Sequence, residues 1–272
     1  MTEVGSIDSS SAEPNISFRD ARTKVDWAEK QIGDLERAIG RLLDNYRKSG
    51  SGGFDPQTGT GYVTNLQLHP FHACLVGDIV FSLRSALDCC WMGLRRAIDA
   101  NEDKGTLPRG DFRNAESTID KAALESAFPG IKRFLLHELK AYKGGNEILW
   151  LTAQADNWNK HNKLNVSFQS TRGSNATLRF PGGAAIKLKG NSGFVGFGGW
   201  PGDFAFATSA SGPPKWDNDS DVSFDILLMI GKTGHERHLM PFLRTALIDT
   251  RNGVDDFIRL FDKIADGGPA PT

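Results

Sequence analysis

The stretch from Phe71 to Asp99 (FHACLVGDIVFSLRSALDCCWMGLRRAID) constrains the fold more than any other part of this 272-residue chain. Its apolar residues recur at the 3.6-residue period of an α-helix. They fall on one arc, which consists of Val76, Ile79, Val80, Leu83, Leu87, Cys90, Trp91, Leu94 and Ile98. An arc this wide predicts a long central helix whose stripe faces a hydrophobic core.

The opposite face of this helix mixes polar and apolar residues, and this mixture indicates that it is covered as well. The face carries Asp78, Ser82, Ser85 and Cys89, with Arg84, Asp88 and Arg95 beside them and Cys74, Phe81 and Met92 between. Covered charges need partners, and Arg84 and Asp88 lie one turn apart. Two interpretations follow: an ion pair that fixes helix packing, or a polar pocket that binds a ligand.

The overall composition is that of an ordinary globular protein, with 39% hydrophobic and 24% charged residues. The net charge of -1 excludes a global attraction to nucleic acid or to acidic membranes and leaves room for a local basic patch. No apolar run is long enough for a transmembrane helix, and the N-terminal residues lack the pattern of a signal peptide. All cysteines lie in the central helix, where the adjacent Cys89 and Cys90 point in different directions, so an internal disulfide is not expected. Reduced thiols are typical of the cytoplasm, and we expect a cytoplasmic protein without membrane contact.

Residues 1–16 are polar and predict a disordered tail, after which a heptad pattern begins. Apolar residues recur every seven positions at Phe18, Val25, Ile32, Ile39 and Tyr46, with Ala21, Ala28, Leu35 and Leu42 between them. This seam predicts a long N-terminal helix. The favoured interpretation is packing within the bundle of the same chain, and the alternative is a homodimer through the Phe18–Tyr46 seam.

The remaining chain predicts an α+β protein with a helical bundle at residues 17–162. Ser49–Gly61 reads as a flexible loop. Further helices are expected at Asn114–Phe128, at Ile131–Tyr142 and from Glu147 to about His161. Between residues 163 and 238 the period changes to two, which predicts an antiparallel β section because no helical pattern interrupts it. A C-terminal helix at residues 239–265 is expected to pack back on the bundle, and residues 266–272 form a second disordered tail.

Several short motifs carry no chemistry. Gly231-Lys232-Thr233 lacks the first glycine of a phosphate-binding loop, since that position is Ile226. The histidines of His69/His72 and of His235/His238 are three residues apart, a spacing that can bind a metal ion on a helix. Pro70 interrupts the first pair, and the second is expected on a strand end or turn, where the two rings point apart. The sequence therefore predicts no metal ion and no cofactor.

A second polar group lies near the end of the helix that ends at His161. Asp156 and Lys160 are one turn apart, and so are Asn157 and His161. Lys160 and His161 suit a helix C-terminus, where the helix dipole favours positive charge. They are interpreted either as a simple helix end with a surface histidine or as part of a binding site.

The central helix and this second helix together resemble a widespread group of uncharacterised bacterial and phage proteins. Gly77–Asp88 (GDIVFSLRSALD) is similar to that group's "GD…NLRSALDH" segment. Tyr142–Asn146 (YKGGN), followed by Leu149-Trp150 and by Asn157–Leu164 (NWNKHNKL), is similar to its "PYKGGN…LW…DNIDKHRLL" segment. The likeness covers roughly residues 71–166, and the group has no assigned activity.

The Arg-x4-His pattern of HEPN domains, many of which are metal-independent ribonucleases, is a more distant resemblance. Arg84 matches the arginine, Cys89 stands at the histidine position, and Asn159 stands at the aspartate position of "DKH". The resemblance implies a helical bundle and binding of RNA or a nucleotide. His161 would then replace the missing histidine as general base, provided that it lies beside Arg84.

These observations lead to two hypotheses, and they leave open whether the chain is an enzyme. In the first, a HEPN-like protein binds RNA or a nucleotide through Arg84 and His161, the candidate catalytic residues; Asp78, Asp88, Asn157 and Lys160 complete the ligand site. In the second, the chain is a non-enzymatic interaction or structural module. Arg84, Asp88 and His161 are then part of a packing network.

Overall fold

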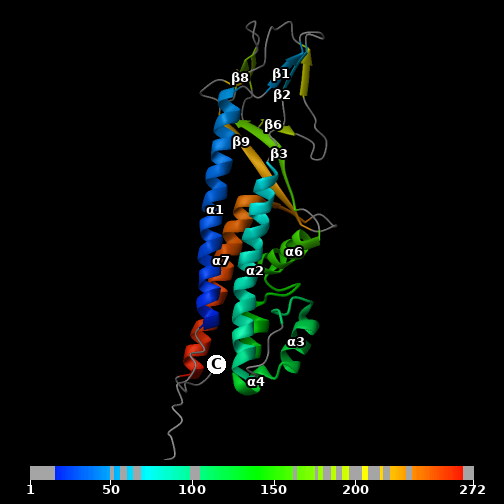
Figure 1. Ribbon diagram of the computed structural model, residues 1–272. Coiled ribbons are helices and arrows are strands. Elements are labelled where there is room, and N and C mark those ends of the chain that lie inside the picture. The colour runs from blue at the N-terminus through cyan, green and yellow to red at the C-terminus, as the bar shows by residue number, and fades with distance from the viewer. Residues whose placement is uncertain are drawn as a thin grey trace, which may run out of the picture. The chain divides into compact units, whose positions relative to one another are not determined.

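The computed structural model describes residues 16–49, 52–55, 60–63, 69–98, 105–161, 164–174, 177–179, 185–187, 192–195, 204–207, 215–216, 221–230 and 235–265. These residues form helices and antiparallel strands, so the predicted α+β class is confirmed (Figure 1). The predicted tail at 266–272 and all but the last residue of the tail at 1–16 lie outside the described residues. The predicted domain boundaries stay a prediction.

The chain divides into two compact units. The first unit comprises Met1–Asp26, Ser82–Trp150 and Asp249–Thr272, and the second comprises Trp27–Phe81 and Leu151–Ile248. Four helices contribute residues to both units: α1 (Ile16–Ser49), α2 (Pro70–Ile98), α6 (Glu147–His161) and α7 (Leu239–Ala265). The polar face of α2 is therefore divided between the units, with Asp78 in the second and Arg84 and Asp88 in the first.

The first unit is helical, and its core is rich in aromatic rings. Phe134 packs edge-on against Phe257 with ring centroids 5.0 Å apart, and Phe18 lies 5.3 Å from Phe261. Its short elements are α3 (Phe112–Lys121), α4 (Leu124–Ala127), α5 (Ile131–Arg133) and the π-helix η1 (Phe134–Leu139). Trp91 is almost completely buried. The predicted apolar stripe of the central helix forms part of this core from Leu83 to Leu94, whereas its last member, Ile98, is 41% exposed at the end of the helix.

The expectation of two continuous helices in this region was wrong. The helix expected at Asn114–Phe128 is interrupted because Ala123 adopts the left-handed conformation, with φ 52°, between α3 and α4. The helix expected at Ile131–Tyr142 widens into η1 and stops at Lys140, with φ 53°. An alanine or a lysine in this conformation gives no signal of a break in the sequence, where glycine is the usual residue.

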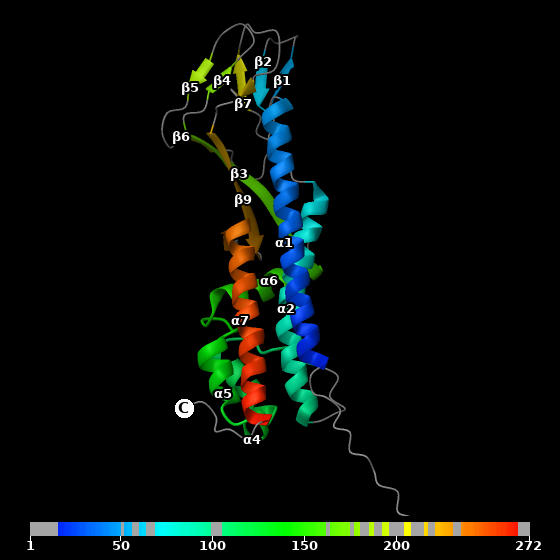
Figure 2. The same ribbon diagram turned by 90° about the vertical axis from the view of Figure 1, so that its left-hand side faces the viewer.

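The N-terminal helix α1 runs antiparallel to the C-terminal helix α7, and both views show the two side by side (Figures 1 and 2). In the second unit Arg244 binds Glu36, and in the first unit Arg251 faces Asp26 and Asp255 faces Arg22. The heptad residues from Phe18 to Ile39 are buried within the chain. Intramolecular packing therefore occupies the seam, as the favoured interpretation predicted.

The second unit holds the strands, and the predicted antiparallel pairing is confirmed. One sheet has the order β10-β9-β3-β6, formed by His235–His238, Asp221–Ile230, Asn165–Ser174 and Ser192–Val195. Another has the order β5-β4-β8, formed by Ala185–Lys187, Thr177–Arg179 and Lys215–Trp216. Ile226, Leu227 and Leu228 are consecutive and buried, so both faces of β9 are covered there.

A further sheet contains strands that the sequence did not predict. The hairpin β1 (Gly52–Asp55) and β2 (Thr60–Val63) pairs with β7 (Phe204–Ala207) in the order β1-β2-β7. The expectation that Ser49–Gly61 is a flexible loop was therefore wrong for these strands. Three glycines and an aspartate, which are poor strand formers, fill half of the positions of β1 and β2 and mask the pattern.

Candidate functional site

The Asp88 carboxylate is the centre of a polar cluster in the first unit. Arg109 Nη2 lies 2.6 Å from Asp88 Oδ1, and the Leu107 backbone N–H donates a 2.9 Å hydrogen bond to the same oxygen. Arg84 Nε lies 3.4 Å from Oδ2, which confirms the predicted pairing of Arg84 with Asp88. We call Arg84, Asp88, Leu107 and Arg109 the Asp88 cluster. Both carboxylate oxygens are thus engaged within the chain.

The Asp88 cluster is largely shielded from solvent. The side chains of Arg84 and Arg109 are 11% exposed and that of Asp88 is 19% exposed. Leu107 is buried and donates to Asp88, and Gly105 approaches Met92, so the segment before α3 covers part of the polar face of the helix.

The prediction that this face is covered is confirmed around Arg84 and Asp88, whereas Ser85, Cys89 and Met92 line an open pocket. It was wrong for Cys74, Asp78 and Phe81 in the second unit, which are exposed because no described segment of that unit covers them.

Sequence reasoning missed Arg109, although it makes the shortest contact with Asp88. Arg109 lies in an irregular loop and is separated from Asp88 by 21 residues, so no helical periodicity links the two. The available signal was indirect: an excess of charge on a covered helix face requires a partner from elsewhere in the chain.

A shallow open pocket of about 310 Å³ lies beside the cluster, between α1 and α2. It is lined by Asp20, Lys24, Ser85, Asp88, Cys89, Met92 and Arg96, and we call it the α1–α2 pocket. Burial raises the pKa of the Cys89 thiol, opposed mainly by Lys24 and reinforced by Asp20 and Asp88. Near neutral pH this thiol is consequently protonated, and it is a poor general base in the position where the HEPN pattern has histidine.

In the second unit, the two stretches that carry the family resemblance contact each other. Gly77 of α2 is buried against Asn159 of α6, and a Cβ at Gly77 would lie 2.3 Å from the Asn159 amide nitrogen. One turn further along α2, Lys160 Nζ lies 5.4 Å from the centre of the Phe81 ring. A side chain larger than hydrogen at Gly77 would interfere with this close approach of the two helices.

The polar residues predicted on this side of the site are mostly exposed. Lys160 pairs with Asp156 at 2.9 Å, and Asp156 is only 1% exposed. Asp78, Asn157 and His161 are exposed to solvent. Phe71 and Phe81, which are 62% and 45% exposed, belong to the same stretch of α2. We call the exposed residues Phe71, Asp78 and Phe81 of α2 and Asn157, Lys160 and His161 of α6 together the α2–α6 face, in which Lys160 and Phe81 are in contact.

The predicted site residues therefore fall into two groups in different units. Arg84 and Asp88 belong to the first unit, whereas Asp78, Asn157, Lys160 and His161 belong to the second. Within the first unit Arg84 is paired and shielded, and within the second His161 is exposed at the end of α6. The joint site of Arg84 and His161 stays a prediction.

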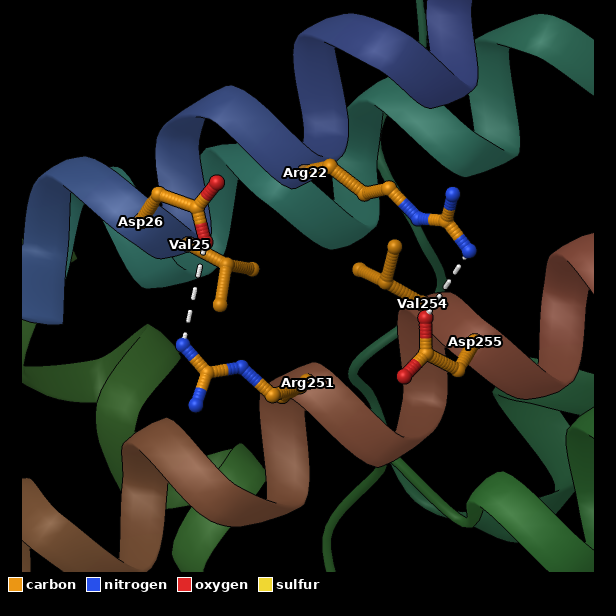
Figure 3. Close-up of a pocket in the computed structure, with 6 residues that line it drawn as sticks. All are labelled: Arg22, Val25, Asp26, Arg251, Val254 and Asp255. Atoms are coloured by element: carbon orange, nitrogen blue, oxygen red, sulfur yellow. Dashed lines mark hydrogen bonds and ion pairs between the residues drawn. The ribbon is translucent and has the colours of Figure 1, made fainter.

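A smaller pocket of about 120 Å³ lies between α1 and α7 in the first unit (Figure 3). Two ion pairs cross it: Arg22 Nη2 lies 3.3 Å from Asp255 Oδ1, and Arg251 Nη2 lies 3.8 Å from Asp26 Oδ1. The buried Val25 and Val254 lie between these pairs. This arrangement is typical of surface ion pairs that flank a helix contact, so we assign no ligand to it.

The described part of the chain contains neither a metal-binding cluster nor a membrane-spanning helix. His235 and His238 lie on strand β10, where a spacing of three residues directs them to opposite faces. The described residues include no group of three or more His, Cys, Asp or Glu side chains placed to hold a metal ion. None of the described helices is both long and apolar enough to cross a membrane.

Comparison with known proteins adds no assignment. No protein-family model, no curated protein and no solved structure matches this chain.

Proposed function

We propose that this chain is a non-enzymatic interaction module that binds a partner protein through the α2–α6 face. In this proposal the Asp88 cluster is structural and fastens the loop before α3 to α2. The observation that carries it is the engagement of both Asp88 oxygens, by Arg109 and Leu107 on one side and by Arg84 on the other. A catalytic arginine has to present its guanidinium to the substrate, whereas Arg84 is shielded and faces a carboxylate of its own chain.

The α2–α6 face suits a protein partner better than RNA. It offers the exposed rings of Phe71 and Phe81, and aromatic residues are enriched in protein interfaces. Its lysine is neutralised by Asp156, and Asp78 adds an exposed carboxylate that repels phosphate. Such a mixture of aromatic rings and balanced charges supports recognition of another protein surface.

The test compares affinity capture by the wild-type chain with capture by a Phe71→Ala, Phe81→Ala double variant. A specific partner should be recovered with the wild type and reduced at least about tenfold with the variant, since exposed aromatic anchors contribute most of the binding energy of an interface. The captured partner is then purified and titrated with both forms. Trp27→Ala removes another exposed aromatic side chain of the same unit, 50% exposed, and serves as the matched control.

Equal recovery with the wild type and the double variant would contradict the proposal. It would also be contradicted if Arg84→Ala kept the wild-type stability and abolished binding or cleavage of RNA. That second result would establish the HEPN-like ribonuclease hypothesis in its place.

A second candidate function, binding of a nucleotide, is supported by the α1–α2 pocket. Its volume of about 310 Å³ lies at the lower end of the range for small-ligand sites. Lys24, Ser85 and Arg96 supply donors for phosphate, and Asp20 and Asp88 supply acceptors. Titration calorimetry with nucleoside mono- and triphosphates tests it: binding should be saturable and lost in Lys24→Ala. No heat of binding from either nucleotide class would rule it out.

A further inference from the structure

An exposed aromatic ring at the start of α3 lies where distant segments of the first unit meet. The backbone at Asp111 bridges to Lys143 in parallel fashion, and the Lys143 N–H donates a 2.8 Å hydrogen bond to the Gly110 carbonyl. The Phe112 ring centre lies 5.6 Å from that of Tyr142 and 6.0 Å from that of His137. We call Phe112, Arg113, His137 and Lys143 the Phe112 patch. It includes the lysine of the YKGGN motif, which the proposed function does not use.

The Phe112 ring rests on a well-supported base. Asp111 caps α3, because its carboxylate accepts a 2.9 Å hydrogen bond from the Asn114 N–H. Tyr142, which packs edge-on against Phe112, is buried and donates a 2.9 Å hydrogen bond from its hydroxyl to the Leu136 carbonyl. Phe112 itself remains 37% exposed. A ring held in this way loses little conformational entropy when a ligand stacks on it.

Two cationic side chains, those of Arg113 and Lys143, belong to the residues beside Phe112. Arg113, His137 and Lys143 are all exposed. Within the part of the chain that the structure describes, neither Arg113 nor Lys143 forms an ion pair, whereas other cations of this unit do: Lys132 pairs with Asp120 and Arg22 with Asp255. Asp111 accepts the cap hydrogen bond and keeps its negative charge, and Glu138, next to His137, pairs with Arg133. Among the described residues, two unpaired cations thus stand against one acid beside the ring. The patch is therefore a local basic surface on a chain whose net charge is -1.

We propose that the Phe112 patch binds single-stranded nucleic acid. A base stacks on the Phe112 ring, and the flanking phosphates contact the Arg113 guanidinium and the Lys143 ammonium. This combination of an aromatic platform and adjacent cations is how proteins bind single strands without reading sequence. The site lies in the first unit, so it is independent of the α2–α6 face and extends the proposed function.

The test is fluorescence anisotropy with labelled RNA and DNA of about 12 nucleotides, a length within the site sizes of single-strand binding proteins. Phe112→Ala should weaken binding about tenfold, the effect of losing one stacked base. The double variant Arg113→Ala, Lys143→Ala should lower the steepness of log affinity against log salt by about 1.4, because each single-strand phosphate contact contributes about 0.7. Phe112→Trp keeps a stacking surface and should retain binding.

Matched controls come from the same chain. Trp27→Ala removes a ring that is 50% exposed in the other unit, and Lys263→Ala removes an exposed lysine of α7; both should bind as the wild type does. Melting temperatures identify any variant that fails to fold. Because Arg113 and Lys143 are exposed, their double variant decides the question even if Phe112→Ala is unstable.

Three outcomes would overturn the proposal. The first is no saturable binding by the wild type at a salt concentration on the order of 50 mM, where electrostatic contacts are strong. The second is binding that the Arg113, Lys143 double variant leaves unchanged. The third is a Phe112→Ala variant that keeps nucleic-acid affinity and loses a protein partner, which would assign the patch to a protein instead.

Discussion

Asp88 and Asp78 lie on the same helix and carry the same charge, and the structure gives them opposite surroundings. Asp88 accepts contacts from Arg109, Leu107 and Arg84 and is 19% exposed, whereas Asp78 lies exposed on the α2–α6 face. The cluster around Asp88 is largely shielded from solvent by its own chain, although Asp88 also lines the α1–α2 pocket, and the face around Asp78 presents aromatic rings to solvent. Position on a helix therefore does not decide whether a carboxylate is structural or available to a partner. Coverage by other segments decides it.

The difference has an energetic consequence. A shielded charge that loses its partner keeps the full cost of desolvation, so the members of the Asp88 cluster depend on one another. An exposed charge exchanges a protein contact for water at little cost. The Asp88 cluster should therefore respond to substitution through stability, and the α2–α6 face should respond through binding.

The largest effect is expected for Asp88→Ala. This change leaves Arg84 and Arg109 without their shared carboxylate, and it should lower the free energy of unfolding by about 3 kcal/mol. Urea denaturation followed by circular dichroism measures it. Asp78→Ala on the same helix is the control and should change stability by less than about 0.5 kcal/mol. Similar losses of stability for the two variants would contradict the distinction between the shielded Asp88 and the exposed Asp78.

The cysteines of α2 probe the same contrast by chemistry. Cys74 is exposed, Cys89 is half-buried and Cys90 is buried. Burial raises the pKa of Cys89, and burial followed by the effect of Cys89 raises that of Cys90. Only the thiolate reacts with a disulfide reagent, and at a pH below the raised pKa the thiolate fraction falls about tenfold for each unit of the rise.

At pH 8 we therefore expect the exposed Cys74 to react first, Cys89 more slowly, and Cys90 only on unfolding. Single-cysteine variants and absorbance at the released thiol chromophore give the rates. Rapid labelling of Cys89 at the rate of Cys74 would show that the region beside the Asp88 cluster is open and ionised.

A smaller effect is expected where α2 contacts α6. Gly77→Ala places a methyl group against the Asn159 amide, which has to move, and the expected loss is about 1 kcal/mol after the gain in helix propensity. Gly40→Ala on α1 meets no atom within 4 Å and should instead stabilise the chain by about 0.5 kcal/mol. Urea denaturation should therefore show a loss of stability for Gly77→Ala and a gain for Gly40→Ala. A gain for both variants would contradict the close packing of α2 on α6.

The smallest effect is expected for the exposed ion pairs between α1 and α7. The Arg22 side chain is 60% exposed, so Arg22→Ala should change the free energy of unfolding by less than about 0.5 kcal/mol in spite of its pairing with Asp255. The same denaturation assay applies. A loss as large as that for Asp88→Ala would mean that shielding does not distinguish the two kinds of pair.

Helical periodicity in the sequence predicted those features of the structure that depend on one helix alone. It located the long helices, the burial of Phe18 and Trp91 and the pairing of Arg84 with Asp88, because residues one turn apart are neighbours whatever the rest of the chain does. It could not supply Arg109, whose contact depends on how a loop folds over α2. It also missed the hairpin of β1 and β2, which is rich in glycine and whose outer partner β7 is distant in the sequence. The π-helix has no sequence pattern of its own and was missed as well.

The free energy of unfolding of Arg84→Ala is the most direct test of whether the Asp88 cluster is structural. If the Asp88 cluster is structural, removal of the guanidinium leaves the Asp88 carboxylate partly uncompensated and lowers stability by about 2 kcal/mol. Stability within about 0.5 kcal/mol of the wild type, the range of an ordinary surface substitution, would contradict a structural role and restore Arg84 as a candidate catalytic residue.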